Sequence, residues 1–149
     1  MARRIEHRPR NGGGHSTKIE AYVDTSAFIA FLDRSDSYHQ TFSRLFSAPP
    51  TLVTSALVVA EGHGWFLRRY DRQRAGEFLA FIETLEPLEV LGFNHVELAK
   101  SRQMLTTFSD QNLTLADAHG LALMKERKSG ICWSTDRHLG LTGVKLAIS

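Results

Sequence analysis

The chain has 149 residues and a formal net charge of +2, and 42% of its residues are hydrophobic. This length is enough for one globular domain with its own core, without disulfides or structural zinc. The single cysteine, Cys132, excludes an internal disulfide and a cysteine-rich metal site, which favours a reducing compartment. No apolar run reaches the length of a membrane helix, and the arginine-rich start does not resemble a signal peptide, so we expect a cytoplasmic protein with no membrane partner.

The first segment of the chain carries an excess of positive charge. Residues 1–18 hold five basic side chains and one acidic side chain, together with Pro9 and three consecutive glycines. They show no apolar period and no phosphate-loop spacing, so we interpret residues 1–18 as a flexible basic extension or a cloning remnant. The remainder, residues 19–149, is close to neutral and is predicted to form the folded domain. The high pI is therefore not a signature of nucleic-acid binding.

From residue 20 onward, short β-prone runs alternate with longer helical runs. Strands are expected at residues 21–23, 51–53, 88–91, 131–134 and 144–148. Helices are expected over residues 27–32, 38–47, 56–70, 72–85, 94–108 and 114–128. The caps Ser55 and Asn94 and the breakers Pro87 and Gly130 support these boundaries. The alternation predicts an α/β fold with helices packed on a mainly parallel sheet.

Four carboxylates stand where an α/β protein of this kind builds a site. Asp24 follows the first strand and Asp136 follows the fourth, whereas Glu61 and Asp117 lie in helices. Ligands of open α/β sheets bind beyond the carboxyl ends of the strands. We therefore expect Asp24 and Asp136 to lie at one edge of the sheet.

Three of these acids also have a purely structural interpretation. Asp24 could cap the helix that begins near Ser26. Asp117 completes a capping-box pattern with Thr114, three residues earlier. Asp136 could be a turn residue or an ion-pair partner. The sequence leaves both interpretations of each residue open.

Glu61 is harder to explain as a structural residue. Leu57 and Trp65 lie one turn away on the same helical face, which predicts that the carboxylate points towards the apolar side. A carboxylate in that position needs an Arg, a His or a metal ion as its partner. Four acids within about 5 Å of one another would repel by roughly 3 kcal/mol per pair at an effective dielectric of about 20, so a shared cation is expected. Oxygen ligands without neighbouring cysteines or paired histidines favour Mg²⁺, with Mn²⁺ as the alternative, and such a site can hydrolyse phosphodiesters.

Four sequence blocks, each containing one of these acids, resemble the PIN-domain nucleases and specifically the VapC-like toxins of toxin–antitoxin pairs. The blocks are Tyr22–Phe28, Thr54–Glu61, Asp110–His119 and Ser134–Leu139. They occur in the order of the family and cover nearly the whole folded chain. Asp110 matches a common position of the family, but a role in capping a loop is the simpler interpretation.

The resemblance implies a three-layer α/β/α fold and a Mg²⁺-dependent endoribonuclease that uses the four acids as its catalytic set. It implies that Asp24 and Asp117 are the direct metal ligands and that the other two acids complete the pocket or act through water. Ser26 and Thr135 match hydroxyl positions that orient these carboxylates. Arg137 is next to the last acid in the sequence, and we expect it to contact substrate or balance charge.

The partners implied by the resemblance are an RNA substrate, a cognate antitoxin and a second copy of the chain in a homodimer. A catalytically weak module that binds RNA or antitoxin remains the main alternative. A flavodoxin-like regulatory domain with Asp24 as phospho-acceptor is a third interpretation, but it would leave Glu61 and Asp136 without a role. A Ser-His-Asp hydrolase is disfavoured because Ser26 lacks the Gly-x-Ser-x-Gly elbow.

Histidines and basic clusters are interpreted mainly as structural or surface features. A general-base role is conceivable for His63, His119 or His138, but a metal-bound hydroxide would make it unnecessary. Two basic clusters could hold RNA phosphates, although a solvated surface is the simpler interpretation. They are Arg68, Arg69, Arg72 and Arg74, and Lys125, Arg127 and Lys128.

Overall fold

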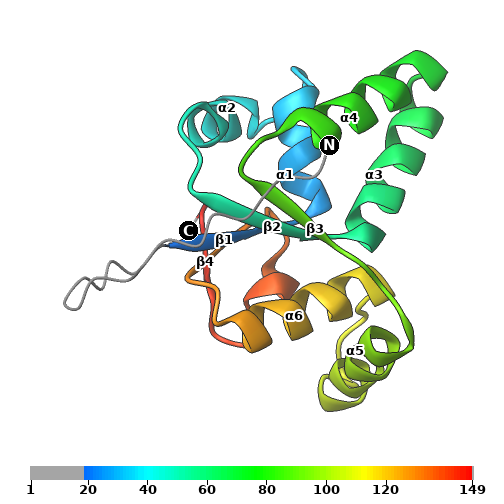
Figure 1. Cartoon of the computed structure of the whole chain (residues 1–149), viewed down its shortest axis with the longest axis vertical. Coiled ribbons are helices and arrows are strands. Elements are labelled where there is room, and N and C mark those ends of the chain that lie inside the picture. Colours follow the sequence, from blue (N-terminus) through cyan, green and yellow to red (C-terminus); the bar gives the residue numbers. More distant parts are fainter. Residues whose placement is uncertain (1–18, 149) are drawn as a thin grey trace.

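A parallel sheet of five strands lies between two helical layers in the computed structural model, which describes residues 19–148 (Figure 1). The strands are β1 (Glu20–Val23), β2 (Thr51–Ser55), β3 (Leu88–Leu91), β4 (Ile131–Trp133) and β5 (Lys145–Leu146), in the order β3-β2-β1-β4-β5. All four neighbouring pairs are parallel. The predicted three-layer α/β/α fold is confirmed. The basic extension predicted for residues 1–18 lies outside the described residues.

The helices divide between the two faces of this sheet. The helices of the first face are α1 (Thr25–Leu32), α2 (His39–Ser47), α3 (Ala56–Arg69) and α4 (Arg72–Thr84). The second face carries α5 (His95–Thr107), α6 (Leu115–Arg127) and the short 3-10 helix η1 (Arg137–Gly140). Figure 1 shows the two groups on opposite sides of the strands. In the part of the chain that the structure describes, no helix is long and apolar enough to cross a membrane.

Alternating side chains of the strands supply the two cores. Ala21 and Val23 of β1 pack with Trp133 of β4 under the helices of the first face. Tyr22 lies between them in the sequence and packs on the second face with Cys132, its partner in the register of β1 and β4. This alternation follows from the two-residue repeat of a strand. Both faces are covered, so most residues of β1 and β2 are buried, whichever face their side chains point to.

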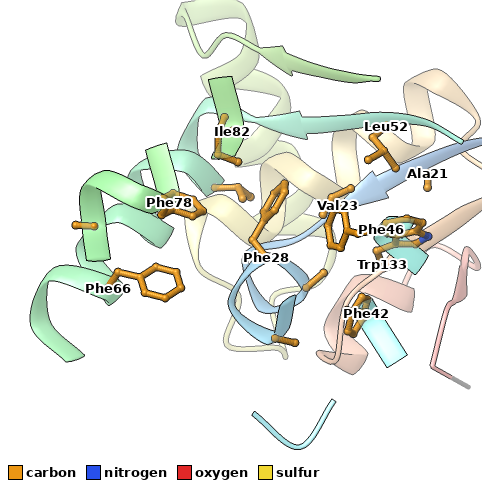
Figure 2. Close-up of a cluster of buried hydrophobic side chains, with 14 residues drawn as sticks. Ala21, Val23, Phe28, Phe42, Phe46, Leu52, Phe66, Phe78, Ile82 and Trp133 are labelled. Atoms are coloured by element: carbon orange, nitrogen blue, oxygen red, sulfur yellow. The ribbon is translucent and has the colours of Figure 1, made fainter. Parts of the chain in front are cut away.

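The first face is packed mainly by aromatic rings (Figure 2). The ring of Phe28 on α1 lies 5.8 Å from that of Phe46 on α2 and 6.1 Å from that of Phe78 on α4. Phe78 stacks in turn on Phe66 of α3 at 5.6 Å. Each such ring, when fully buried, contributes about 1.5–3 kcal/mol through removal of apolar surface from water. This cluster fixes α1 and α3, and with them the segments that carry Asp24 and Glu61.

On the second face, α6 approaches the sheet closely at a glycine. A Cβ atom added at Gly120 would lie 2.9 Å from the hydroxyl oxygen of Tyr22, which is closer than real Cβ contacts allow. The absence of a side chain therefore lets the start of α6 lie against β1. Asp117 is one turn earlier on the same helix and is brought towards the carboxyl end of β1.

The order of the strands creates a switch point between β1 and β4. The chain leaves β1 towards α1 on the first face, and it leaves β4 towards η1 on the second face. A crevice opens at such a point because the two connections depart in opposite directions. The backbone N–H of Asp24 donates to the carbonyl of Trp133 at 3.0 Å, which ties the two strand ends together.

Candidate metal-dependent active site

Asp24 is the most deeply placed of the four acids. Its side chain accepts hydrogen bonds on Oδ2 from the hydroxyls of Ser26 and Ser134, both at 2.9 Å. It occupies the N-cap position of α1 but makes no side-chain capping hydrogen bond. Asp24 is therefore the N-cap residue by position, but its side chain does not cap the helix. The two serines hold its carboxylate at the end of the sheet.

The environment of Asp24 disfavours its charge. Burial raises the pKa of this carboxyl from 3.8 to about 6, and the hydrogen bonds from Ser134 and Ser26 limit the rise. The negative charge of Asp117 raises the pKa further, which shows that the two carboxylates are close enough to repel. A cation next to Asp24 would relieve both penalties.

Glu61 lies at the rim of the site, not against the apolar side of its helix. Its side chain is exposed, so the prediction of a buried carboxylate is wrong. The turn of α3 rotates Glu61 towards α1, where the hydroxyl of Thr25 donates to Oε1 at 2.5 Å. Thr25 directly follows Asp24, so one short segment holds two of the four acids in place.

Asp117 caps its own helix and also faces the site. Its backbone N–H donates to Oγ1 of Thr114, and its Oδ2 accepts from the backbone N–H of Thr114, both at 3.1 Å. The predicted capping box is thus present. It restricts the carboxylate to one orientation at the start of α6, so the structural and the functional interpretations of Asp117 are compatible.

Asp136 follows β4 and begins η1, where its Oδ1 accepts from the backbone N–H of His138 at 2.9 Å. The Nδ1 atom of His138 lies 3.3 Å from the same oxygen. One carboxylate oxygen of Asp117, one of Asp136 and one ring nitrogen of His138 lie within 4.8 Å of one another. Asp136 is therefore a turn residue that also contributes to a potential ligand set.

The four acids converge on a single pocket of about 480 Å³. Its lining consists of Asp24, Thr25, Ser26, Ile29, Glu61, Trp65, Arg68, Thr114, Asp117, Thr135 and Asp136. They come from the ends of β1 and β4 and from the facing turns of α1, α3 and α6. The convergence expected from the sequence is thus present in the structure.

The supporting residues differ in part from those expected. Ser26 orients Asp24 as predicted, but the second hydroxyl on Asp24 belongs to Ser134. Thr135 contributes its backbone N–H, which donates to Ser26 Oγ at 3.0 Å. Arg137 is exposed and does not line the pocket, whereas Arg68 does. The position of Ser134 at the last residue of the expected fourth strand, two residues before Asp136, was the signal that could have identified it.

His119 has a structural role that its nearness to Asp117 in the sequence does not reveal. It is fully buried, with Nδ1 at 2.7 Å from Ser55 Oγ and Nε2 at 3.0 Å from Glu97 Oε1. Ser55 caps α3 and Glu97 lies in α5, so the imidazole joins three helices two residues after Asp117. His119 does not line the acidic pocket.

The donor set fits a hard divalent cation. Asp24, Glu61, Asp117 and Asp136 offer carboxylate oxygens around one open volume, which suits Mg²⁺ or Mn²⁺. Burial raises the pKa of Asp24, and the charge of Asp117 raises it further, so a bound cation would favour the ionised form of this carboxylate. The imidazole of His138 beside two of the acids adds a nitrogen donor, which Mn²⁺ accepts more readily than Mg²⁺.

Comparisons with known proteins agree with this geometry. A family model described as PIN domain matches residues 21–144. The crystal structure of VapC20 from Mycobacterium tuberculosis, described as a Sarcin-Ricin loop cleaving toxin, is similar, with a TM-score of 0.76 and 22% identity over 83% of this chain and 95% of that chain. A search of curated protein sequences finds no match.

Two further structures share the fold at lower similarity. VapBC2 from Rickettsia felis, solved with a DNA fragment from its promoter, has a TM-score of 0.57 and 15% identity over 86% of this chain and 97% of that chain. A toxin–antitoxin complex from Klebsiella pneumoniae has a TM-score of 0.58 and 16% identity over 85% and 94%. These structural likenesses concern the fold, and the family match covers the segments that carry all four acids. The chain therefore belongs to the PIN domain family.

Proposed function

We propose that this protein is a divalent-metal-dependent endoribonuclease and the toxin of a toxin–antitoxin pair. The observation that carries the proposal is the convergence of Asp24, Glu61, Asp117 and Asp136 on one pocket at the switch point of the sheet. Membership of the PIN domain family and the likeness to VapC20 support RNA as the substrate class. The toxin–antitoxin complexes among the similar structures support an antitoxin as the partner.

Each of the four acids has a proposed role that follows from its position in the pocket. Asp24 and Asp117 would hold the metal ion, with Asp136 next to Asp117 and Glu61 at the rim of the pocket. Mg²⁺ is the proposed ion and Mn²⁺ the alternative. When bound, such an ion supplies a nucleophilic water at neutral pH and stabilises the charge that develops on the phosphate oxygens.

Side chains of the protein hold the acids in the orientations that hydrolysis requires. Ser26 and Ser134 fix the orientation of Asp24, and the capping box fixes Asp117, so little reorganisation is needed when substrate binds. Glu61 is held by Thr25 at the open side of the pocket, where it can accept a proton from an attacking water. Arg68 is the basic residue of the lining and would contact a phosphate of the RNA.

The test uses the purified full-length chain and a labelled single-stranded RNA. We expect cleavage in the presence of Mg²⁺ that EDTA stops and that added Mg²⁺ restores. Asp24→Asn and Asp117→Asn should each lower the rate by about a hundredfold or more, because each removes a charge that acts on the reacting centre. Asp110→Asn is the matched control, because Asp110 is exposed and does not line the pocket. Full activity in both site variants would refute the proposal.

A further inference from the structure

A second pocket, of about 780 Å³, lies at the opposite end of the sheet from the acids. It is enclosed by the second half of α5, the last turn of α6 and the loop that leads into β5. Its lining includes the residues that precede β4 and β5, whereas the acidic pocket lies beyond the carboxyl ends of β1 and β4. The two pockets are therefore separate sites. We call the second one the lysine pocket.

The charged residues of the lysine pocket are all lysines. Lys125, Lys128 and Lys145 line it, and its lining contains no acidic residue. Within residues 19–148 none of the three makes an ion pair. Their charged neighbours on α6 differ, because Glu126 pairs with Lys100, and Arg127 pairs with acids of two strands. Three exposed lysines without an ion-pair partner among the described residues thus line one pocket.

The favourable position of cations at a helix C-terminus explains two of these lysines. Lys125 lies in the last turn of α6 and Lys128 is its C-cap residue, where the helix dipole favours positive charge. Lys145 lies in a strand, which has no such dipole. Lys128 has a left-handed backbone, φ 53°, at a position where glycine is the usual residue. A lysine at that position accepts a conformational cost of about 1–2 kcal/mol that glycine would avoid.

The floor of the pocket is apolar and contains one aromatic ring. Phe108 and Met104, both half-buried, belong to its lining together with the fully buried Met124. The site therefore offers a surface for a flat ring and three ammonium groups for an anion.

We propose that the lysine pocket binds a nucleoside phosphate, with the base against Phe108 and Met104 and the phosphate held by the lysines. Proteins that bind single-stranded nucleic acids combine positive charge with aromatic side chains on which bases stack, and lysine is a common phosphate-binding residue. The volume lies in the range of small-ligand sites. An acidic peptide would satisfy the charges, but the single ring beneath them favours a base.

The proposal extends the proposed function and rests on it for the source of the nucleotide. Asp117 and Lys128 lie near opposite ends of α6, about 16 Å apart along the helix axis at 1.5 Å per residue. An RNA strand cut at the acidic pocket could place a more distant nucleotide in the lysine pocket. A free mononucleotide has the same chemistry, so the test includes both.

The test measures binding in EDTA, where metal-dependent cleavage does not occur. The ¹⁵N-labelled full-length chain is titrated with 5′-AMP and, separately, with a short oligoadenylate. We expect saturable shifts of the amide signals of Ser129, Gly130 and Gly143, which line the pocket. Shifts with the oligoadenylate alone would assign the site to a nucleotide within RNA, and shifts with AMP as well would assign it to free nucleotides too.

The variants identify the groups that bind. Lys125→Gln and Lys128→Gln should each weaken binding by about tenfold, as for loss of a charge-assisted hydrogen bond to phosphate. Each should also lower the slope of log K against log salt by about 1, which a purely structural effect would not do. Arg34→Gln and Arg44→Gln are the controls, because both remove an exposed positive charge on the other side of the sheet.

Failure of this proposal is distinguishable from failure of the proposed function. Unchanged pocket signals with both AMP and the oligoadenylate would overturn the proposal, even in a protein that cleaves RNA. A response to a glutamate-rich peptide but to neither nucleotide ligand would overturn it too. Lysine-dependent binding of AMP by a chain that cleaves no RNA would uphold the lysine pocket and refute the nuclease.

Discussion

The two faces of the sheet are held together by different interactions, although each contributes two of the four acids. The first face, next to Asp24 and Glu61, is packed with phenylalanine rings around Trp133. The second face, next to Asp117 and Asp136, contains a buried polar chain through His119. Packed rings contribute much to the free energy of unfolding but restrict the orientation of their neighbours only weakly. A hydrogen bond contributes less to that free energy but restricts the orientation of its two partners. Stability is therefore concentrated on the first face, and the orientation of Asp117 depends more on the second.

The largest effect is expected from the ring cluster. Phe28→Ala removes a fully buried ring that contacts Phe46 and Phe78, so the free energy of unfolding should fall by about 3–5 kcal/mol. Urea unfolding followed by circular dichroism measures the loss. Leu67→Ala, on the exposed side of α3, should change stability by less than about 0.5 kcal/mol. Equal effects of the two substitutions would show that the first face does not carry the stability.

The second-largest effect on stability is expected from Asp24, whose carboxylate lies at the end of β1, between the two helical layers. Its folded-state pKa of about 6 lies above the ordinary 3.8, so the folded chain binds this proton more tightly than the unfolded chain does. The resulting stability is fully present below about pH 4 and is lost as the pH rises through 6, by about 3 kcal/mol at 1.4 kcal/mol per pKa unit. Asp24→Asn should therefore be more stable than the parent chain at pH 7.5 while lacking RNA cleavage.

Urea unfolding of both proteins at several pH values without divalent ions isolates this contribution. Other titrating groups are common to both proteins, so their contributions cancel in the difference between the two stability curves. Glu97 is one of them, and its pKa is lowered mainly by its hydrogen bond with His119. Parallel stability curves from pH 4 to pH 7 would contradict a raised pKa at Asp24. Cleavage by the parent chain should rise with pH through about 6, because the ionised carboxylate is the metal-binding form.

A smaller loss of stability is expected on the second face. His119→Ala leaves the Ser55 hydroxyl and the Glu97 carboxylate without their buried partner, which should cost about 1–3 kcal/mol. Because Asp117 lies two residues earlier on the same helix, cleavage should also fall by about tenfold to a hundredfold at a temperature where the variant is fully folded. His119→Gln retains a donor and an acceptor and should recover part of both properties. Normal cleavage by folded His119→Ala protein would separate this network from the site.

The smallest effect is expected from Ser26 and Ser134, the two serines that donate hydrogen bonds to Asp24. Ser134→Ala removes one of two hydroxyl donors to Asp24 and should cost about 1 kcal/mol. The pKa of Asp24 should rise further, so the midpoint of the pH–rate profile should move upward by up to about one unit. Ser26→Ala tests the second donor, and a profile that neither substitution moves would exclude Asp24 as the group observed.

The sequence predicted the elements well because their patterns are local. The strand before Asp24, the caps Ser55 and Asn94 and the capping box at Asp117 are all as expected. Errors arose where a side chain's direction depends on another segment. Glu61 was expected to point inward from its helical neighbours, but the hydroxyl of Thr25 on α1 holds it at the exposed rim.

What the sequence determined by itself is the alternation of strands and helices and the placement of four acids near strand ends and helix starts. These follow from short-range periodicity and capping, which involve residues a few positions apart. Only the tertiary structure decided that Ser134 binds Asp24 across the switch point, that Asp24 is buried with a raised pKa, and that three lysines share one pocket. The physical reason is that hydrogen bonds, desolvation and charge repulsion depend on distances between segments that only chain packing sets.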